Sequence, residues 1–484
     1  MTLAYAFGRS AITDAFVNAY GIPNIILSFI VGATATSYIP IYTAIDSKQK
    51  FTDNLITIFA ILGISFSLLV FIAPQPFLKL VAWTAEPEVY KLSLSLMRYM
   101  AFAMIPMLIA SILSAQLQVK SKFFVATVYQ IFNNAFIIVG IFVAKATTFL
   151  PWIAFGLVIG NIASTMVLVV ADREDLRLYK PTINLSDSNV RKFFILLAPI
   201  MLSTLVGQIN TIVSQNVANS LENHAVSTLN YANKVQNVFT AFIGTAVGTA
   251  FFPEMAKTAG SGDKDGLRDQ ISNSLKALLP ILIPITIGIL LLAEPLIRIL
   301  LERGQFNPED TILTATALKF VIFTMFAGNI NQMVSRGFYA MQKTKLPAII
   351  SAACVVLNIL CILALVKPLQ YRGLALASSI SGMASMVAYY VLLKKELGSL
   401  SIYRVSEWIK LGVATTVMTV IVIVGRSLLP LMTGSYLTCL VSLVGLVGIS
   451  VILYVISLIV MKTEIAGMAI GMIKNRGKNI KVAG

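Results

Sequence analysis

Residues 14–40 read DAFVNAYGIPNIILSFIVGATATSYIP, an apolar run with one acid at its start and with glycine and proline inside it. As a helix at ~1.5 Å per residue, this run is about 40 Å long, more than the ~30 Å of hydrocarbon in a bilayer. Comparable runs follow along the whole chain of 484 residues, which is 57% hydrophobic and only 12% charged. Because soluble proteins carry about 25% charged residues, the composition predicts a polytopic helical membrane protein.

The opening stretch has a second copy in the sequence. Asn24–Pro40 (NIILSFIVGATATSYIP) aligns without a gap with Asn237–Pro253 (NVFTAFIGTAVGTAFFP). Further pairs follow in the same order, including Arg98 with Lys319 and Ala163-Ser164 with Ala384-Ser385. We interpret the two halves as copies of a six-helix unit that face the same way. A parallel repeat of this kind predicts a substrate site between the halves, near the middle of the membrane.

The apolar runs predict membrane spans, with kinks at the internal prolines Pro23, Pro106, Pro199 and Pro284. The expected fold is all-α, with two six-helix lobes, two additional C-terminal helices and a truncated first helix, since the opening MTLAYAF is too short to span. The domains expected are an N-lobe (1–172), a cytoplasmic linker (173–188), a C-lobe (189–396), two extra helices (405–463) and a basic tail (464–484). The spans are expected at 11–43, 54–82, 89–119, 122–145, 150–172, 189–218, 223–257, 268–301, 309–341, 345–367, 371–394, 406–429 and 434–462.

The distribution of Lys and Arg predicts the orientation. The formal net charge is +16, and cytoplasmic loops of membrane proteins collect these residues. The opposite set of loops carries fewer than half as many, so we expect the C-terminus to be cytoplasmic and the basic tail to lie on the anionic inner leaflet. The excess of cations is therefore not taken as a sign of nucleic-acid binding. The basic set comprises the loops near 48–50, 120–122, 173–192, 257–268, 343–345 and 394–410 and the tail from Lys462 to Lys481.

Signals for metal, cofactor or catalytic chemistry are weak. The cysteines Cys354, Cys361 and Cys439 lie inside apolar spans and are interpreted as small buried hydrophobes. The single histidine, His224, is interpreted as a solvated turn residue. The sequence contains no ATP-binding lysine loop and no zinc-protease motif. We therefore expect neither cofactor, metal nor catalytic residue, and transport driven by an ion gradient, the membrane potential or the substrate's own gradient.

Ionisable residues inside apolar spans are candidates for function, because they are costly there. The excess of cations favours an anionic ligand such as a phosphate. The alternative for the cations is snorkelling to the headgroups or an interhelical pair, and for Asp14 a role as an N-terminal acid of its helix. The substrate-binding candidates are Asp14, Asn24, Arg98, Lys234, Lys276, Lys319 and Arg336.

Several motifs resemble those of the MurJ/MviN family of lipid II flippases. They run in order along nearly the whole chain, and the strongest is R-G-F-Y-A-M-Q-K-T-K-L-P at Arg336–Pro347. The others are T-D-A-F at Thr13–Phe16, I-P-N at Ile22–Asn24, Y-I-P at Tyr38–Pro40, E-R-G-Q-F at Glu302–Phe306 with Asp310-Thr311, and Phe252-Pro253.

The resemblance implies two six-helix lobes around a cationic cavity, with two further helices that form a lipid-facing groove. It further implies a multi-pass protein of the bacterial cytoplasmic membrane that flips lipid II for peptidoglycan synthesis, cell-wall biogenesis and cell shape. The expected partners are a lipid-linked glycan pyrophosphate and membrane lipids, and the protein is expected to act as a monomer. Asp14 falls on the family's acid and Lys276 on a basic cavity position. The family's arginines after I/L-P-N are replaced by Ile25, Ile26, Leu27 and Ser28.

Other functions remain open at this point. A flippase for another polyprenyl-pyrophosphate-linked oligosaccharide, of the exopolysaccharide or O-antigen type, fits the same features. A multidrug antiporter would be expected to carry acids in its cavity, whereas the excess here is basic. A membrane glycosyltransferase would need a catalytic acid on an outer loop, and a non-transporting scaffold would leave the buried cations and the repeat unexplained.

Overall fold

The computed structural model describes residues 1–221, 224–260, 263–341, 343, 345–400, 402–464 and 466–467. Within these ranges the side chains of residues 27, 31, 32, 202, 203, 206, 245–254, 256, 257, 259 and 260 are left out. The regular elements of the described chain are all helices, and eleven of them are long and apolar enough to cross a membrane. The predicted fold class, an all-α polytopic membrane protein, is confirmed. The part of the expected basic tail after Gly467 lies outside the described residues.

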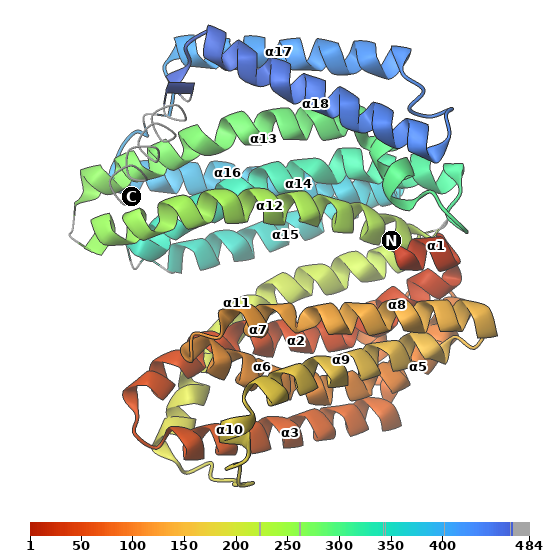
Figure 1. The fold of residues 1–484 in the computed structure, drawn as a ribbon, viewed down its shortest axis with the longest axis vertical. Coiled ribbons are helices and arrows are strands. Elements are labelled where there is room, and N and C mark those ends of the chain that lie inside the picture. Colours follow the sequence, from red (N-terminus) through yellow and green to blue (C-terminus); the bar gives the residue numbers. More distant parts are fainter. Residues whose placement is uncertain are drawn as a thin grey trace, which may run out of the picture. The chain divides into compact units, whose positions relative to one another are not determined.

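The chain forms two compact units (Figure 1). Unit 1 contains Met1–Ser227 and the short segment Arg303–Asn307, and unit 2 contains Thr228–Glu302 and the chain from Pro308 onward. These units are defined by contacts, whereas the expected lobes were defined by the repeat, so the lobe boundaries stay a prediction. The helices of unit 1 are α1 (Thr2–Phe7), α2 (Ala11–Ala44), α3 (Lys48–Ile72), α4 (Pro74–Ala82), α5 (Pro87–Met100), α6 (Met104–Val119), α7 (Phe123–Val128), α8 (Gln130–Thr147), α9 (Pro151–Ala171), α10 (Arg173–Leu176) and α11 (Ser188–Asn219).

The remaining helices form unit 2, apart from the first turn of α12, which belongs to unit 1. They are α12 (Ala225–Gly260), α13 (Lys264–Leu301), α14 (Pro308–Ala340), α15 (Lys345–Leu369), α16 (Tyr371–Leu397), α17 (Val405–Leu428) and α18 (Tyr436–Val460).

Each predicted span falls on observed helices, but some spans are divided. The span expected at 54–82 is split into α3 and α4, which begins at Pro74. Proline lacks the N–H that would continue the first helix, and it suits the first turn of a new one. The span expected at 89–119 tightens to a 3₁₀ turn at Ala101–Ala103, just before Pro106.

Helix α2 is fixed in unit 1 by its polar residues as well as by packing. The Ser10 hydroxyl caps the N-terminus by accepting from the Thr13 N–H at 3.4 Å. Farther along, Asn18 donates to Asn219 of α11 at 2.7 Å and accepts from Asn219 at 3.0 Å and from Gln215 at 2.9 Å. Because amides inside an apolar bundle need partners, this network joins α2 to α11 in one register.

The segment expected as a cytoplasmic linker is ordered and attached to unit 1. Asn54 of α3 and Asn184 exchange two hydrogen bonds of 2.8 and 2.9 Å between side chain and backbone. The Asp53 carboxylate accepts from the Lys180 N–H at 3.1 Å, and the Lys120 ammonium contacts Asp175 at 2.6 Å. The linker is therefore bound by hydrogen bonds to the start of α3 and by an ion pair to the end of α6.

In unit 2, α17 and α18 pack on each other and on α13 (Figure 1). Two apolar clusters hold them, one around Leu443 and Leu446 and the other around Leu411 and Leu458. Helix α13 contains Pro280, Pro284 and Pro295. Its non-helical residue is Leu292 (φ −107°, ψ 16°), three residues before Pro295, a break that the sequence analysis did not expect. The kink expected at Pro284 stays a prediction.

Candidate functional site

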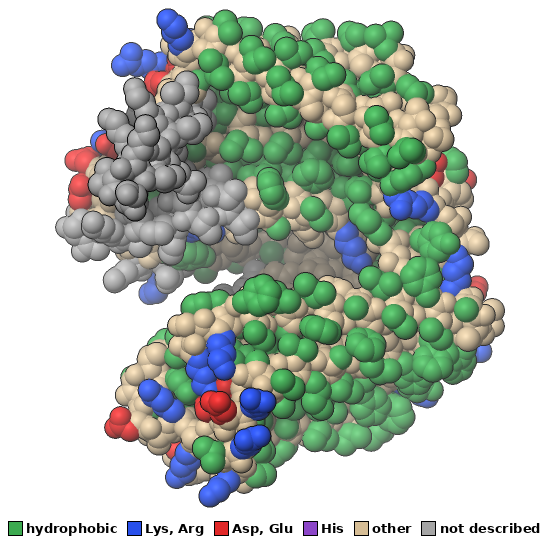
Figure 2. Space-filling model, in the orientation of Figure 1, with side chains coloured by type: hydrophobic (Ala, Val, Ile, Leu, Met, Phe, Trp, Pro, Cys, Tyr) green, Lys and Arg blue, Asp and Glu red, His purple; other side chains and the backbone are tan. Residues whose placement is uncertain are grey.

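An apolar groove lies between α13 and the pair α17–α18 of unit 2. Its volume is about 430 Å³, and Phe239 of α12 also lines it. Apart from Ser450 and Tyr454, its side chains are hydrophobic or glycine. In the space-filling view, hydrophobic side chains cover the visible faces of α17 and α18, and charged side chains gather toward the helix ends (Figure 2). The groove residues include Pro280, Ile281, Pro284, Ile285, Gly288, Ile289, Leu292, Leu296, Met418, Val422, Leu443, Val447, Val451 and Val455.

Charged residues border one end of this groove, one turn before Pro280. The Lys276 ammonium lies 3.2 Å from a carboxylate oxygen of Glu464, and the Tyr403 hydroxyl donates to the Lys276 carbonyl. Glu407 accepts from Lys410 at 2.6 Å and from the Glu464 N–H at 2.9 Å. Burial first, and the nearby carboxylates in addition, raise the pKa of Tyr403, so its hydroxyl keeps the proton that it donates.

A second charged cluster borders the other part of α13. Glu294 accepts from Lys319 of α14 at 2.7 Å and from Arg426 of α17 at 2.8 Å. One turn on, Arg298 donates to the carbonyls of Leu431 and Gly434, both at 3.1 Å, in the loop between α17 and α18. Lys319 is thus part of an interhelical pair, the alternative that the sequence analysis left open for it.

In unit 1, Asp14 of α2 contacts the residues at the start of α12. The Asp14 side chain is 7% exposed. One of its oxygens accepts from the Ser227 N–H at 2.8 Å, and the other lies 2.9 Å from Nδ1 of His224. The hydrogen bond that His224 donates to the Asp14 carboxylate raises the pKa of His224. His224 is a partly exposed turn residue, as expected, but its ring is also bound to Asp14, which the sequence analysis did not expect.

A cavity of about 190 Å³ adjoins this pair and is lined by Asp14, His224, Glu86 and Asn219 among others. Sequence reasoning missed this arrangement, because His224 lies more than two hundred residues after Asp14 and nothing in its local pattern points to an acid.

The other predicted site residues are spread over both units. Arg98 on α5 and Asn24 on α2 have exposed side chains in unit 1. Lys234 on α12 is exposed and Arg336 on α14 is half-buried in unit 2. Their joint action on one substrate stays a prediction.

Glu294 is the site residue that the sequence analysis missed in unit 2. Its signal was available, since it is an acid inside the apolar run ILLLAEPLIRIL. An acid inside an apolar span is costly unless a cation pairs with it. Lys319 and Arg426 both pair with Glu294.

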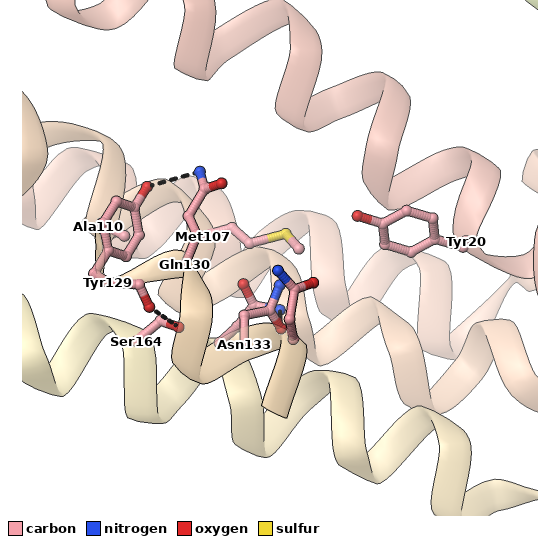
Figure 3. Close-up of a pocket in the computed structure, with 9 residues that line it drawn as sticks. Tyr20, Met107, Ala110, Tyr129, Gln130, Asn133 and Ser164 are labelled. Carbon is pink, nitrogen blue, oxygen red and sulfur yellow. Dashed lines mark hydrogen bonds between the residues drawn. The ribbon is translucent and has the colours of Figure 1, made fainter. Parts of the chain in front are cut away.

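A further pocket of about 190 Å³ lies inside unit 1 (Figure 3). Amide side chains of α8 and α9 line it, and the Tyr20 hydroxyl points toward the side where Met107 and Asn133 lie. Asn161 donates to Asn133 at 3.1 Å, and the Ser164 hydroxyl donates to the Tyr129 carbonyl at 2.9 Å. The pocket is polar but carries no charged lining residue.

Comparison with known proteins decides the family. The profile of the family described as lipid II flippase MurJ matches residues 3–442. The chain belongs to this family. The resemblance seen in the sequence motifs is thereby confirmed.

Curated relatives match over most of the chain. A probable lipid II flippase MurJ of Rhizobium tropici is 27% identical, over 99% of this chain and 93% of that protein. One of Helicobacter pylori (strain ATCC 700392 / 26695) is 26% identical, over 79% of this chain and 87% of that protein.

Solved structures share the fold. A lipid II flippase MurJ in an inward closed conformation aligns with a TM-score of 0.80 at 22% identity, covering 94% of each chain. An inward-facing multidrug resistance transporter of the MATE family, in the MOP superfamily, aligns with a TM-score of 0.67 at 14% identity. That alignment covers 83% of this chain and 96% of the transporter.

Proposed function

We propose that this protein flips lipid II, the lipid-linked peptidoglycan precursor, from the inner to the outer leaflet of the bacterial cytoplasmic membrane. Family membership and the curated relatives, each named a probable lipid II flippase, support the proposal. The eleven apolar helices support a multi-pass membrane protein. The flippase works by alternating access as a transporter rather than an enzyme, acts as a monomer and has a cytoplasmic C-terminus.

The observation that carries the proposal is the apolar groove of unit 2 with charged residues at its borders. A polyprenyl chain already lies in the hydrocarbon of the bilayer, so its binding depends on van der Waals packing rather than on leaving water. The groove offers it a wall of aliphatic side chains for such packing. A pyrophosphate needs cations instead. Lys276 lies one turn from the first groove residue of α13, so one ligand can be held by both.

Lys276 is the cation that we assign to the pyrophosphate. In the structure its ammonium is paired with Glu464, whose side chain is 40% exposed. The Lys276 side chain is 17% exposed, so this ion pair is partly open to water and adds little stability. The two negative charges of a pyrophosphate can therefore displace the carboxylate. Arg98, Lys234 and Arg336 are assigned to later contacts along the path. Asp14, in the first turn of α2, and Asn24, next to Pro23 of the same helix, are assigned to it as well.

The alternatives are less well supported. A flippase for another polyprenyl-linked glycan would use the same groove, but the curated relatives point to lipid II. A multidrug antiporter shares only the fold, at 14% identity.

The test is complementation of bacteria depleted of their own lipid II flippase. We expect this chain to restore growth, and Lys276→Ala to lose the rescue at normal membrane expression. Lys276→Arg should retain part of it, since the charge remains. Lys395→Ala, which removes an exposed cation of α16, is the matched control. A well-expressed wild-type chain that fails to rescue would contradict the proposal, and full rescue by Lys276→Ala would contradict the assignment of Lys276.

A further inference from the structure

Three backbone carbonyls of helix α13 lack a hydrogen bond within the helix, and they lie on the side that faces α17 and α18. In an α-helix, the N–H of each residue donates to the carbonyl four residues earlier. Proline has no N–H, so Pro280, Pro284 and Pro295 leave the carbonyls of Lys276, Pro280 and Leu291 without their helical donors.

Each of these carbonyls accepts instead from a side chain of the C-terminal segment. The Tyr403 hydroxyl donates to the Lys276 carbonyl, and the Tyr454 hydroxyl donates to the Pro280 carbonyl at 2.8 Å. Arg426 donates to the Leu291 carbonyl at 2.9 Å. Tyr403 precedes α17, Arg426 belongs to α17 and Tyr454 belongs to α18. The hydrogen bonds to α13 are therefore distributed along both helices of the pair.

These bonds run beside the groove. The acceptors span fifteen residues of α13, which is ~22 Å of helix. Tyr454 and Pro280 both line the groove, and the Tyr454 side chain is 6% exposed. A carbonyl left without a donor in an apolar environment is costly, so each proline makes α13 depend on the neighbouring pair for its missing hydrogen bond.

We propose that the prolines of α13 are docking points for α17–α18, and that Tyr454 is a positioning residue for the polyprenyl chain. Its bond to the Pro280 carbonyl fixes α18 at a set distance from α13 in the groove, and Tyr403 and Arg426 do the same toward the groove ends. The part concerning the polyprenyl chain rests on the proposed function. The ligand class is a polyprenyl phosphate, held by its hydrocarbon chain.

The test combines Tyr454→Phe with Pro284→Ala. The first variant removes the donor and keeps the ring, and the second restores the N–H that the Pro280 carbonyl lacks. Binding of a fluorescent polyprenyl phosphate to the purified full-length protein is measured for the wild type, both single variants and the double variant. Tyr390→Phe, which alters an exposed tyrosine of α16, is the matched control.

We expect Tyr454→Phe alone to weaken binding about fivefold to tenfold, the effect of one hydrogen bond of ~1–1.5 kcal/mol. In the Pro284→Ala background the same substitution should change binding less than about twofold, because the carbonyl then has its own helical donor. Deuterium uptake of residues 436–460 should rise in Tyr454→Phe and return toward its starting level in the double variant.

Three results would count against the proposal. An equal loss from Tyr454→Phe in both backgrounds would show that the hydroxyl acts without the freed carbonyl. Unchanged binding in Tyr454→Phe, with the wild type binding well, would overturn the positioning role alone. A wild-type protein that binds no polyprenyl phosphate would instead overturn the proposed function and the positioning role together.

Discussion

Asp14 shows how a single buried acid organises its surroundings. It is the second residue of the T-D-A-F motif in α2, and its contacts are with His224 and with the Ser227 N–H at the start of α12. The Ser227 contact places a carboxylate at a helix N-terminus, where the unpaired N–H groups favour negative charge. The contact with His224 depends on pH, because the imidazole ring changes its charge near neutral pH.

The pairing of His224 with Asp14 predicts a pH-dependent stability. The hydrogen bond that the His224 ring donates to Asp14 raises the pKa of His224 above its ordinary value of ~6.5. A raised pKa means that the stabilisation is full below ~6.5 and is lost as the pH rises through the folded-state pKa. Because the ring is 39% exposed and therefore screened by water, the contribution is below about 1 kcal/mol. The unfolding temperature of the wild type should therefore fall more steeply than that of His224→Gln between pH ~6 and ~8.5.

Asp14→Asn provides the control for this measurement. It retains an oxygen for the Ser227 N–H but removes the charge that His224 senses, so its pH profile should match that of His224→Gln. Identical profiles for the wild type and both variants would show that the pair does not stabilise the charged ring.

At the level of single residues, the candidate charged residues could be predicted from the sequence, but the residues that pair with them could not. Asp14, Lys276 and Lys319 stand out as charges in or beside apolar runs. Their partners, His224, Glu464 and Glu294, are between 25 and 210 residues away along the chain. Such pairings depend on which helices become neighbours, and no local pattern carries that information.

Among the elements, α13 connects the largest number of described charged contacts in unit 2. It bears Lys276, Glu294 and Arg298, and each of them contacts the α17–α18 segment or α14. We expect Glu294→Gln to lower the unfolding free energy by ~1–2 kcal/mol, because two cations lose one shared carboxylate. Thermal unfolding followed by size-exclusion chromatography measures the effect.

Glu309→Gln is the matched control, since Glu309 is an exposed acid in the first turn of α14. A loss of stability in the control equal to that in Glu294→Gln would mean that net charge, and not the bridge between α14 and α17, is responsible.

The helices themselves were largely predictable from sequence, because a membrane span needs only a long apolar run. The divisions within them were not. The break after Ile72 and the 3₁₀ turn at Ala101–Ala103 are local choices of the backbone near Pro74 and Pro106. At Pro284 the backbone keeps helical dihedral angles, and the freed Pro280 carbonyl accepts from Tyr454. This hydrogen bond lies in the tertiary structure and could not be read from the proline.

For the whole molecule, the distribution of charge predicts the orientation. In unit 1, Lys and Arg gather at the end where α10 and the start of α3 lie (Figure 2). The positive-inside rule assigns that end to the cytoplasm. Along the sequence, the set of loops richest in Lys and Arg also includes the tail from Lys462 to Lys481. We therefore expect a fluorescent protein fused to the C-terminus to fluoresce, and an alkaline phosphatase fused there to be inactive. The opposite pair of results would reverse the assignment.

The family and the polytopic fold were accessible from sequence because motifs and hydropathy are local properties. The repeat suggested two lobes, but the lobe boundaries depend on which helices share contacts. The groove between α13 and α17–α18 was expected only through the family resemblance, since its lining residues look like ordinary lipid-facing side chains in the sequence.

The most direct test of the central claim is a measurement of lipid II in the outer leaflet. Cells depleted of their own flippase and expressing this chain are treated with an enzyme or toxin that reaches only the outer face, and the cleaved lipid II is quantified. The account predicts outer-leaflet lipid II near the level of undepleted cells, with a clear decrease for Lys276→Ala. Lipid II that stays in the inner leaflet, in cells with normal amounts of the protein in the membrane, would contradict it.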